Sequence, residues 1–335
     1  MCKITITGGA GYIGSSLILN KYLSKNKLTI IDRFYFGSNY INKKIKLIKK
    51  DIRDITPNDF KDQDIVIDLA ALSNDPSCDL NINLTKDINY QGRINSAIQA
   101  KKAGVKKYIF MSSCSVYGKN NKLQLSEKSR TDPISEYAKT CLEAEEKILS
   151  FSDNYFQVTI LRNATVYGVS DRMRFDLVVN LMTATAFYEN TIYIMGGGLQ
   201  YRPLININDI SGYLIEIIKS KNNKYSNEIF NIGYKNYTVN EIAEIIKNTI
   251  DLKINIKRLP DDNDKRNYHI DFSKSNSTFK YKPNVSIEDS AYEIYNLLKV
   301  GKISKNEKTS TIGWYKFLIN SKKIIDEISI DNKIF

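Results

Sequence analysis

The feature that most constrains the fold is a set of three glycines directly after a short β-branched run at the N-terminus. Residues 3–7 read KITIT, and Gly8, Gly11 and Gly14 follow with the spacing G-x-x-G-x-x-G. An apolar stretch with helical spacing continues to about residue 22, and residues 27–32 (KLTIID) predict a second strand. This order predicts a βαβ unit whose turn lets a pyrophosphate approach the helix N-terminus, because no Cβ atoms stand in the way.

The residue that ends the second predicted strand favours NAD over NADP. Asp32 follows Gly14 by 18 residues, a spacing at which a carboxylate accepts hydrogen bonds from the adenosine ribose. The same carboxylate repels a 2′-phosphate, so we expect NAD. Arg33 keeps NADP open as the alternative, since its guanidinium could pair with a 2′-phosphate if Asp32 turned away.

The rest of the N-terminal half alternates between strand-like and helical patterns. Strand-like runs lie at 45–49, 65–69, 107–112 and 156–161, and helical periodicity lies at 89–103 and 135–149. This alternation predicts an α/β fold with a Rossmann-type, doubly wound parallel sheet that carries helices on both faces. We expect this NAD-binding domain to span residues 1–168.

Beyond residue 168 the pattern changes and predicts a smaller, mixed α/β substrate lobe. Helical segments lie near 175–188, 209–219, 239–250 and 287–298, separated by short strands and polar turns. We expect the lobe to span residues 169–299, with segments returning to the first domain, and a helical C-terminal extension to span residues 300–335. Large apolar side chains at near-helical spacing over residues 314–330 favour a docked helix over a disordered tail.

Composition and charge argue against several classes of protein. The 335 residues carry 49 Lys and Arg against 37 Asp and Glu, a net charge of +12, but the lysines are scattered and form no basic stripe, so we expect no nucleic-acid partner. No apolar stretch approaches the roughly 20 residues of a membrane span. The first residues lead straight into a strand pattern, so we expect a cytoplasmic protein without membrane contact. One histidine and four cysteines without a CxxC pair predict no metal site.

Eight short strings, which begin at residue 7 and end at residue 268, resemble those of the extended short-chain dehydrogenase/reductase family. Within it they resemble the NAD-dependent sugar-nucleotide epimerase/dehydratase branch. The strings are TGGAGYIG (7–14), DIRD (51–54), LAAL (69–72), SSCSVYG (112–118), YA (137–138), RMRFDLVVNLM (172–182), YRPLININD (201–209) and KRNY (265–268). The resemblance implies NAD as the cofactor, a nucleoside-diphosphate sugar as the substrate, and a homodimer.

The resemblance also implies site residues. Tyr137 would exchange a proton with a sugar hydroxyl while a hydride moves to the nicotinamide, and Ser113 would hydrogen-bond the same oxygen. Arginines among the substrate residues would bind the diphosphate. The cofactor residues would be Gly8, Gly11, Tyr12, Ile13, Gly14, Asp32, Arg33, Asp51, Ile52, Leu69, Ala70, Ala71, Asn89, Ser112 and Tyr137, with Asp51 and Ile52 beside the adenine and Asn89 supporting the site from a neighbouring helix. The substrate residues would be Ser73, Ser113, Asn180, Arg202 and Arg266.

Position 141 departs from the family pattern YxxxK, in which tyrosine and lysine lie one helical turn apart. Residues 137–141 read YAKTC, so Cys141 occupies the third catalytic position. Lys139 cannot replace the missing lysine, because two residues along a helix turn its side chain about 200° away. A phenol with a pKa of about 10 is only ~0.1% ionised at pH 7. An engineered variant, a natural enzyme that tolerates the change, and a cofactor-binding protein that has lost turnover all remain open.

The residues after Ser113 narrow the reaction. Dehydratase and decarboxylase relatives carry Asp or Glu at one of the next two positions, where this chain has Cys114 and Ser115, so we expect no elimination of water. Oxidation at C4 of the sugar remains, as a 4-epimerase or a 4-dehydrogenase, and a 4-ketose reductase would use the same residues. The strings RMRFDL and DKRNY also resemble GDP-heptose 4-dehydrogenases, so the nucleobase stays open among GDP, UDP and dTDP.

Overall fold

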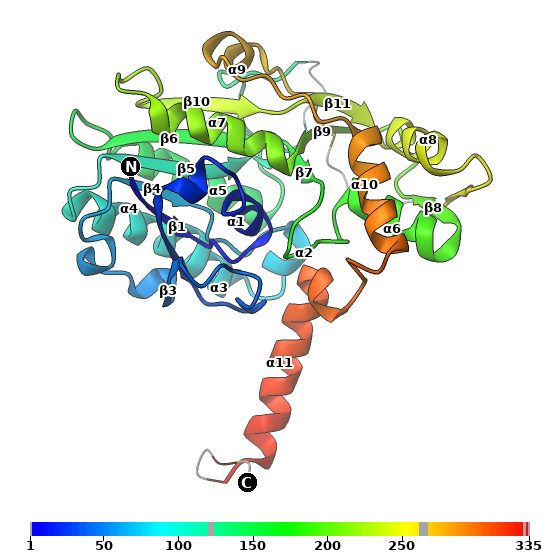
Figure 1. Cartoon of the computed structure of the whole chain (residues 1–335), viewed down its shortest axis with the longest axis horizontal. Helices are drawn as coiled ribbons and strands as arrows, with labels where there is room; N and C mark the ends of the chain where they lie inside the picture. The colour runs from blue at the N-terminus through cyan, green and yellow to red at the C-terminus, as the bar shows by residue number, and fades with distance from the viewer. Residues whose placement is uncertain (1, 120–123, 261–266, 331–332, 334–335) are drawn as a thin grey trace.

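The computed structural model describes residues 2–119, 124–260, 267–330 and 333 (Figure 1). Its main body is a seven-stranded sheet in the order β3-β2-β1-β4-β5-β6-β10, and every neighbouring pair is parallel. The predicted Rossmann-type sheet is therefore confirmed. Its strands are β1 (Lys3–Thr7), β2 (Lys27–Asp32), β3 (Lys46–Lys49), β4 (Ile65–Asp68), β5 (Lys107–Ser113), β6 (Gln157–Asn163) and β10 (Glu228–Ile232).

Helices cover both faces of the sheet, which explains why the central strands read as nearly continuous apolar runs. On one face, Leu17 and Leu214 join the apolar side chains of the strands in a single buried cluster. On the other face, Ala97 and Ile148 belong to a second cluster. The helices are α1 (Tyr12–Leu17) and α7 (Ile207–Lys219) on the first face, and α4 (Arg93–Lys102) and α5 (Glu136–Leu149) on the second.

The second lobe contains two small sheets and three helices around a core of its own. One sheet has the order β11-β9-β7, and β12 pairs with β8 in parallel. Val179, Ile242 and Ile287 bring the three helices together in the core. The elements are β7 (Thr165–Tyr167), β8 (Thr191–Ile194), β9 (Tyr201–Asn206), β11 (Lys235–Thr238), β12 (Asn255–Arg258), α6 (Val178–Glu189), α8 (Val239–Ile250) and α10 (Ile287–Lys299). Since α7 and β10 lie in the main body, the chain passes between the two parts more than once.

Two predicted helices differ from the observed ones. The first helix ends at Leu17, because the side chain of Asn20 accepts the backbone N–H groups of Tyr22 and Leu23 and turns the chain. The helical pattern over 89–103 is split into a π-helical turn at Asp87–Gly92 and α4. Among the described helices, none is long and apolar enough to cross a membrane.

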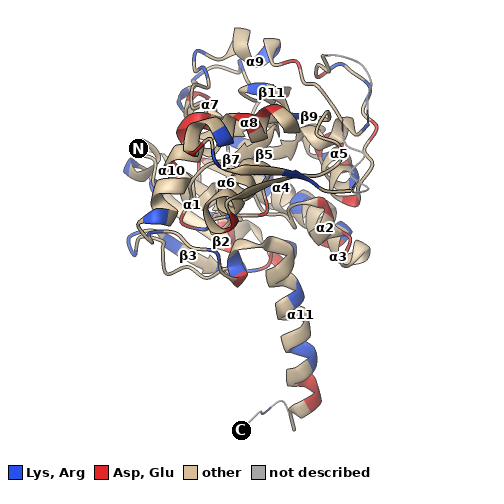
Figure 2. Cartoon of the chain, turned by 90° about the vertical axis from the view of Figure 1, so that its right-hand side faces the viewer, with Lys and Arg blue, Asp and Glu red and all other residues tan. Residues whose placement is uncertain are grey.

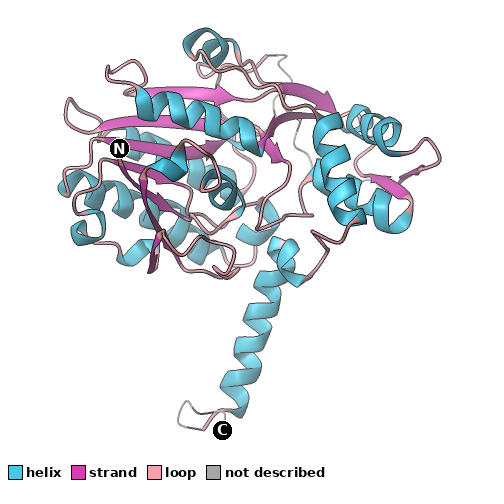
Figure 3. Cartoon of the chain, in the orientation of Figure 1, coloured by secondary structure: helices cyan, strands magenta, loops and turns pink. Residues whose placement is uncertain are grey.

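The C-terminal extension forms α11 (Thr311–Ile328), which docks on the body only through its first turns. The indole N–H of Trp314 donates to the carbonyl of Tyr35 at 2.7 Å. Figures 1 and 3 show the remainder of the helix projecting away from the body. The expectation of a docked helix therefore holds only for its beginning, since Phe317, Ile324 and Ile328 stay exposed. Figure 2 shows acidic and basic residues interspersed over the body and along α11.

Candidate active site

A cavity opens at the carboxyl ends of the central parallel strands, the edge at which open α/β sheets bind their ligands. The loops that follow β1, β2, β4 and β5 line it. Arg172 and Arg174 line it from the loop between β7 and α6, and Tyr315 lines it from α11. The cavity is thus built from both lobes and from the C-terminal extension.

The glycine turn after β1 has room only for glycine at two positions. Gly8 has a φ of +68°, and a Cβ there would lie 2.7 Å from the backbone of Ala70. A Cβ on Gly14 would collide with the backbone of the same turn. Gly11 is the N-cap of α1. The turn therefore places the first N–H groups of α1 at the cavity wall without side chains in front of them, as phosphate binding requires.

Asp32 ends β2 at the cavity wall, and both of its carboxylate oxygens accept backbone hydrogen bonds. Oδ2 accepts the N–H of Ala10 at 3.0 Å, and Oδ1 accepts the N–H of Phe34 at 2.7 Å. Burial raises the pKa of this carboxyl, while the N–H groups act in the opposite direction. The side chain is fixed beside the glycine turn, where it can accept hydrogen bonds from ribose hydroxyls and disfavours a 2′-phosphate.

Asp51 lines the cavity after β3 and is held by two arginines. Nε and Nη2 of Arg53 each donate at 2.9 Å, and Nη1 of Arg33 donates at 2.7 Å. The hydrogen bonds of Arg53 are the main cause that lowers the pKa of Asp51 to about 2. Because Nη1 of Arg33 already donates to Asp51, this guanidinium is less suited to pair with a 2′-phosphate.

Arg172 is a buried guanidinium with no carboxylate at ion-pair distance within the described part of the chain. Its Nη2 donates to Oγ1 of Thr311 at 2.9 Å, and its plane lies over the ring of Phe36. Its buried Nε has no hydrogen-bond partner among the described residues. Burial and the nearby Arg174 lower the pKa of Arg172 to about 10, so it stays charged at neutral pH. A buried cation with an unused donor in a cavity wall fits an anionic ligand such as a pyrophosphate.

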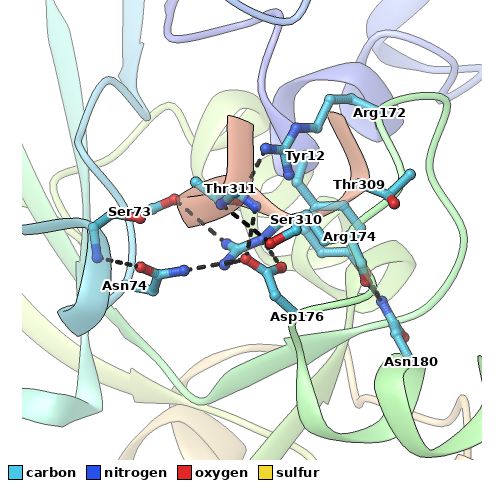
Figure 4. A network of polar contacts seen from close by, with 12 residues as sticks. Tyr12, Ser73, Asn74, Arg172, Arg174, Asp176, Asn180, Thr309, Ser310 and Thr311 are labelled. Carbon is cyan, nitrogen blue, oxygen red and sulfur yellow. Dashed lines mark hydrogen bonds and ion pairs between the residues drawn. The ribbon is translucent and has the colours of Figure 1, made fainter. Parts of the chain in front are cut away.

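Arg174 also lines the cavity, but a carboxylate balances its charge (Figure 4). Asp176 accepts Nε at 2.8 Å and Nη2 at 3.2 Å, while Nη1 lies 3.4 Å from Oγ of Ser73. Asp176 also accepts the side-chain amide of Asn74 at 3.2 Å and the backbone N–H of Thr311 at 3.0 Å. This network joins the loop after β4, the loop before α6 and the beginning of α11 around the cavity.

Ser112 and Ser113 end β5, and both line the cavity. Oγ of Ser113 accepts the backbone N–H of Ser115 at 3.1 Å, which orients the hydroxyl. The hydroxyl of Ser112 donates to the buried Glu145, whose carboxylate pairs with Arg162 at 2.7 Å. Ser112 is thus part of a buried hydrogen-bond network, whereas the hydroxyl of Ser113 can donate a hydrogen bond to a ligand in the cavity.

Tyr137 lies in the first turn of α5 and lines the same cavity as Ser113. The helix begins there because the side chain of Ser135 accepts the N–H of Ala138. Burial raises the pKa of Tyr137 well above its ordinary value, and Cys141 adds to this effect while Arg93 opposes it. The phenol is therefore neutral near pH 7 in the absence of a ligand.

Cys141 lies one turn after Tyr137 but does not line the cavity. It is buried, and its thiol interacts with the Tyr137 phenol one helical turn earlier. Burial raises the pKa of the thiol to about 12, so it carries no charge at neutral pH. Lys139 is exposed and pairs with Glu136 at 2.9 Å. No cation of α5 therefore takes the place of the missing lysine.

Three further expected site residues do not line the cavity. Oδ1 of Asn89 accepts the backbone N–H of Leu72 at 2.8 Å, and its Nδ2 donates to the carbonyl of Leu72 at 3.0 Å, so Asn89 positions the loop after β4. Asn180 is fully buried, and its amide donates to the Tyr12 hydroxyl at 3.0 Å and holds the loop before α6. Arg202, in β9, is buried and donates to the carbonyl of its neighbour at 2.9 Å. Arg266 lies outside the described residues.

All the other expected cofactor residues line the cavity, and so do the expected substrate residues Ser73 and Ser113. Wall residues that the sequence did not point to include Arg93, Arg172, Arg174 and Tyr315. The arginines 172 and 174 stand in the string RMRFDL, which we used only as a resemblance. No local signal points to Arg93 or Tyr315, because each reaches the cavity through tertiary packing.

The profile of the family described as NAD dependent epimerase/dehydratase matches residues 4–233. The chain belongs to this family. A Methanocaldococcus jannaschii member, provisionally named UDP-glucose 4-epimerase, is 30% identical over 306 residues and is matched over 98% of its length and 88% of this chain.

Solved structures of the family share the fold over nearly the whole chain. The UDP-N-acetylglucosamine 4-epimerase of Methanobrevibacter ruminantium M1, in complex with UDP-N-acetylmuramic acid, is 26% identical with a TM-score of 0.81 and covers 90% of this chain and 99% of its own. The UDP-glucuronic acid 4-epimerase of Bacillus cereus, in complex with UDP-glucuronic acid and NAD, is 25% identical with a TM-score of 0.79 and covers 89% and 99%.

NAD is the cofactor of the NAD-dependent epimerase/dehydratase family, and the cavity fits it. The glycine turn offers backbone N–H groups to the pyrophosphate, and the unused Nε of Arg172 offers a charged donor. Asp32 stands where an adenosine ribose would be recognised. As a member of this family, the chain is an NAD-dependent enzyme of sugar-nucleotide chemistry.

Proposed function

We propose that this enzyme uses NAD to oxidise the C4 hydroxyl of a nucleoside-diphosphate sugar and acts as a 4-epimerase. The observation that carries the proposal is the meeting of Ser113 and Tyr137 with the glycine turn in one cavity. A base and a hydrogen-bond donor for a sugar oxygen therefore face the site of a hydride acceptor. The names of the relatives described above, all 4-epimerases, support this choice.

Each residue has a definite task in this proposal. Tyr137 takes the proton of the C4 hydroxyl and later returns it, while Ser113 holds the same oxygen in place through its hydroxyl. NAD, when bound, accepts a hydride from the sugar carbon and gives it back. Because burial raises the pKa of Tyr137, proton removal needs positive charge close to the phenol.

A dehydratase is disfavoured by the residues next to Ser113. Cys114 is buried, its thiol donates to the carbonyl of Arg162 at 3.3 Å, and burial raises the pKa of that thiol. Ser115 lines the cavity with a hydroxyl. Neither side chain supplies the carboxylic acid that elimination of water requires.

A 4-dehydrogenase is the second candidate, because release of the oxidised sugar uses the same residues up to the first hydride transfer. A ketose reductase would run that step in reverse. The candidate nucleobases can also be ranked. UDP-sugars come first because the relatives carry those names, and GDP-sugars follow because of the string RMRFDL (172–177).

A panel of UDP-, GDP- and dTDP-sugars with the purified protein and NAD tests the proposal. The expected result is a C4 epimer, identified by NMR, without net accumulation of reduced nicotinamide. Accumulation of absorbance at the reduced-nicotinamide band together with a keto sugar would assign the 4-dehydrogenase instead. Binding of NAD and a sugar nucleotide without any product would contradict both and favour a protein that has lost turnover.

A further inference from the structure

Tyr137 requires a neighbouring positive charge, and helix α5 does not provide one. The thiol of Cys141, one turn later, is neutral and buried, and Lys139 pairs with Glu136 on the exposed face. A buried phenol resists ionisation unless an opposite charge lies nearby. Among the described residues, such a charge has to come from an element that packs against α5, and α4 is such an element.

Arg93, the first residue of α4, is a guanidinium in the wall of the cavity that Tyr137 also lines. It is only 1% exposed. Nε donates to Oδ2 of Asp68 at 3.0 Å, and Nη2 donates to the carbonyls of Asp68 at 3.0 Å and Met111 at 2.9 Å. The guanidinium lies over the ring of Phe110 at 3.7 Å. Nη1 makes no hydrogen bond to the described residues, so this guanidinium nitrogen is free to donate while the rest of the side chain is held in place.

The carboxylate of Asp68 lies behind the guanidinium of Arg93, outside the cavity wall. It also accepts the hydroxyls of Thr7 at 2.7 Å and Tyr108 at 2.9 Å and the N–H of Ala70 at 3.2 Å. These donors share the negative charge of Asp68 with Arg93. Burial lowers the pKa of the Arg93 guanidinium, but Asp68, Cys141 and Tyr108 together more than offset this effect and raise it, so Arg93 is charged.

Arg174 is a second cation that acts on the phenol, but both oxygens of the Asp176 carboxylate bind its guanidinium, whereas only one oxygen of Asp68 binds that of Arg93. Asp176 binds Arg174 through two hydrogen bonds, so its field at Tyr137 is reduced. The cysteines near the phenol are neutral and supply no positive charge, and the carboxylate of Asp75 opposes its ionisation. The titratable and charged groups that act on Tyr137 are Cys141 from α5, Arg93 from α4, Cys78 and Asp75 from α2 (Asp75–Cys78), and Arg174 from the loop before α6.

We propose that Arg93 is the positioning residue that supplies Tyr137 with its positive charge in this chain, which makes a neutral residue at position 141 acceptable. The inference rests on the proposed role of Tyr137 as acid and base. This role of Arg93 also explains why position 141 holds a cysteine and not a lysine. A lysine there would place a second buried cation beside Arg93, whereas a cysteine fills the space as a small apolar group.

The test is a titration of the phenol itself, which does not depend on turnover. Tyr137 is replaced by 3,5-difluorotyrosine, whose more acidic phenol can be followed by fluorine NMR. Arg93→Gln is combined with Asp68→Asn, so that no carboxylate is left buried and unpaired. We expect the midpoint to rise by about one pH unit or more. The matched control, Arg174→Gln with Asp176→Asn, should shift the midpoint much less.

Two further variants separate charge from structure. Arg93→Lys keeps the charge but loses the separate hydrogen bonds of Nε and Nη2, and should leave the midpoint close to that of the unsubstituted protein. Cys141→Lys added to the Arg93→Gln and Asp68→Asn background should lower the raised midpoint again. An unchanged midpoint after loss of Arg93, or a larger shift in the Arg174 control, would overturn the proposal. If the titration behaves as expected but no sugar nucleotide is converted, the proposed reaction fails and the role of Arg93 stands.

Discussion

The guanidinium carbon of Arg172 lies 3.7 Å from the centroid of the Phe36 ring. Phe36 belongs to the loop after β2, and Arg172 belongs to the loop before α6, so the contact joins the two sides of the cavity. Thr311 adds a hydrogen bond from the C-terminal extension. Because no carboxylate of the described residues lies at ion-pair distance from this cation, we expect it to bind the pyrophosphate of the cofactor.

Arg172→Gln should weaken NAD binding by about 10- to 100-fold, the range expected when a buried charged hydrogen bond is lost. Isothermal titration with NAD, ADP-ribose and adenosine provides the measurement. Only the two ligands with a pyrophosphate should lose affinity. Arg130→Gln, a change at an exposed arginine, serves as the control. An equal loss for adenosine would show that the variant damages the whole cavity.

Gly8→Ala should abolish measurable NAD binding and lower the free energy of unfolding by at least about 2 kcal/mol. The added Cβ would meet the backbone of Ala70 at a position with φ of +68°. Gly104→Ala is the matched control, since it has a φ of +79° and open space around it. That control should cost about 1 kcal/mol and leave NAD affinity unchanged. Similar results for both variants would refute the close approach at Gly8.

Asp51→Asn should lower the free energy of unfolding at pH 7 by about 1–2 kcal/mol. This value is smaller than the pKa shift of Asp51 alone implies, because solvent screens the charges of the partly exposed arginines. The pKa of Asp51 is depressed to about 2 by Arg53 and Arg33. Its contribution is therefore present above the ordinary value of 3.8 and is lost as the pH falls toward 2. Urea unfolding at pH 7, 5 and 3 should show a gap between the two proteins that narrows at pH 3. A constant gap would contradict this linkage.

Tyr315→Ala should reduce NAD affinity by about 2- to 10-fold, the value of lost aromatic contacts. Tyr315 lines the cavity from α11 and meets Tyr35 and Phe36 with ring centroids 6.0 and 5.8 Å away. Phe317→Ala removes a 45% exposed ring from the same helix and is the control. Equal affinities for all three proteins would exclude the extension from the cofactor site.

The sequence predicted the elements whose patterns are local. The strands at 3–7 and 27–32 and the helix at 239–250 match the structure in type and bounds, because β-branched runs and an apolar helical face define them. The first helix was placed too long, since the turn at Asn20 depends on side-chain hydrogen bonds to the backbone. The projecting part of α11 could not be predicted, since its apolar spacing is the same whether or not it docks.

In the candidate site, too, some residues could be placed from local patterns and others depend on tertiary contacts. Glycines and the residues at strand ends, such as Asp32, could be placed because parallel strands deliver their carboxyl ends to one edge. The position of Arg93 depends on Asp68, 25 residues earlier, and the contact of Trp314 with Tyr35 spans 279 residues. Such partners become visible only when the fold brings them together. For the same reason it could not be predicted that Asn180 does not line the cavity.

The most direct test of the central claim uses a UDP-sugar that carries deuterium at C4, or its GDP counterpart if the panel selects one. We predict a C4 epimer that keeps the deuterium, since the hydride leaves and returns to the same carbon. We also predict a loss of at least about 100-fold in rate for Tyr137→Phe, with NAD affinity preserved. An epimer whose deuterium has exchanged with water, or full activity in Tyr137→Phe, would contradict the central claim.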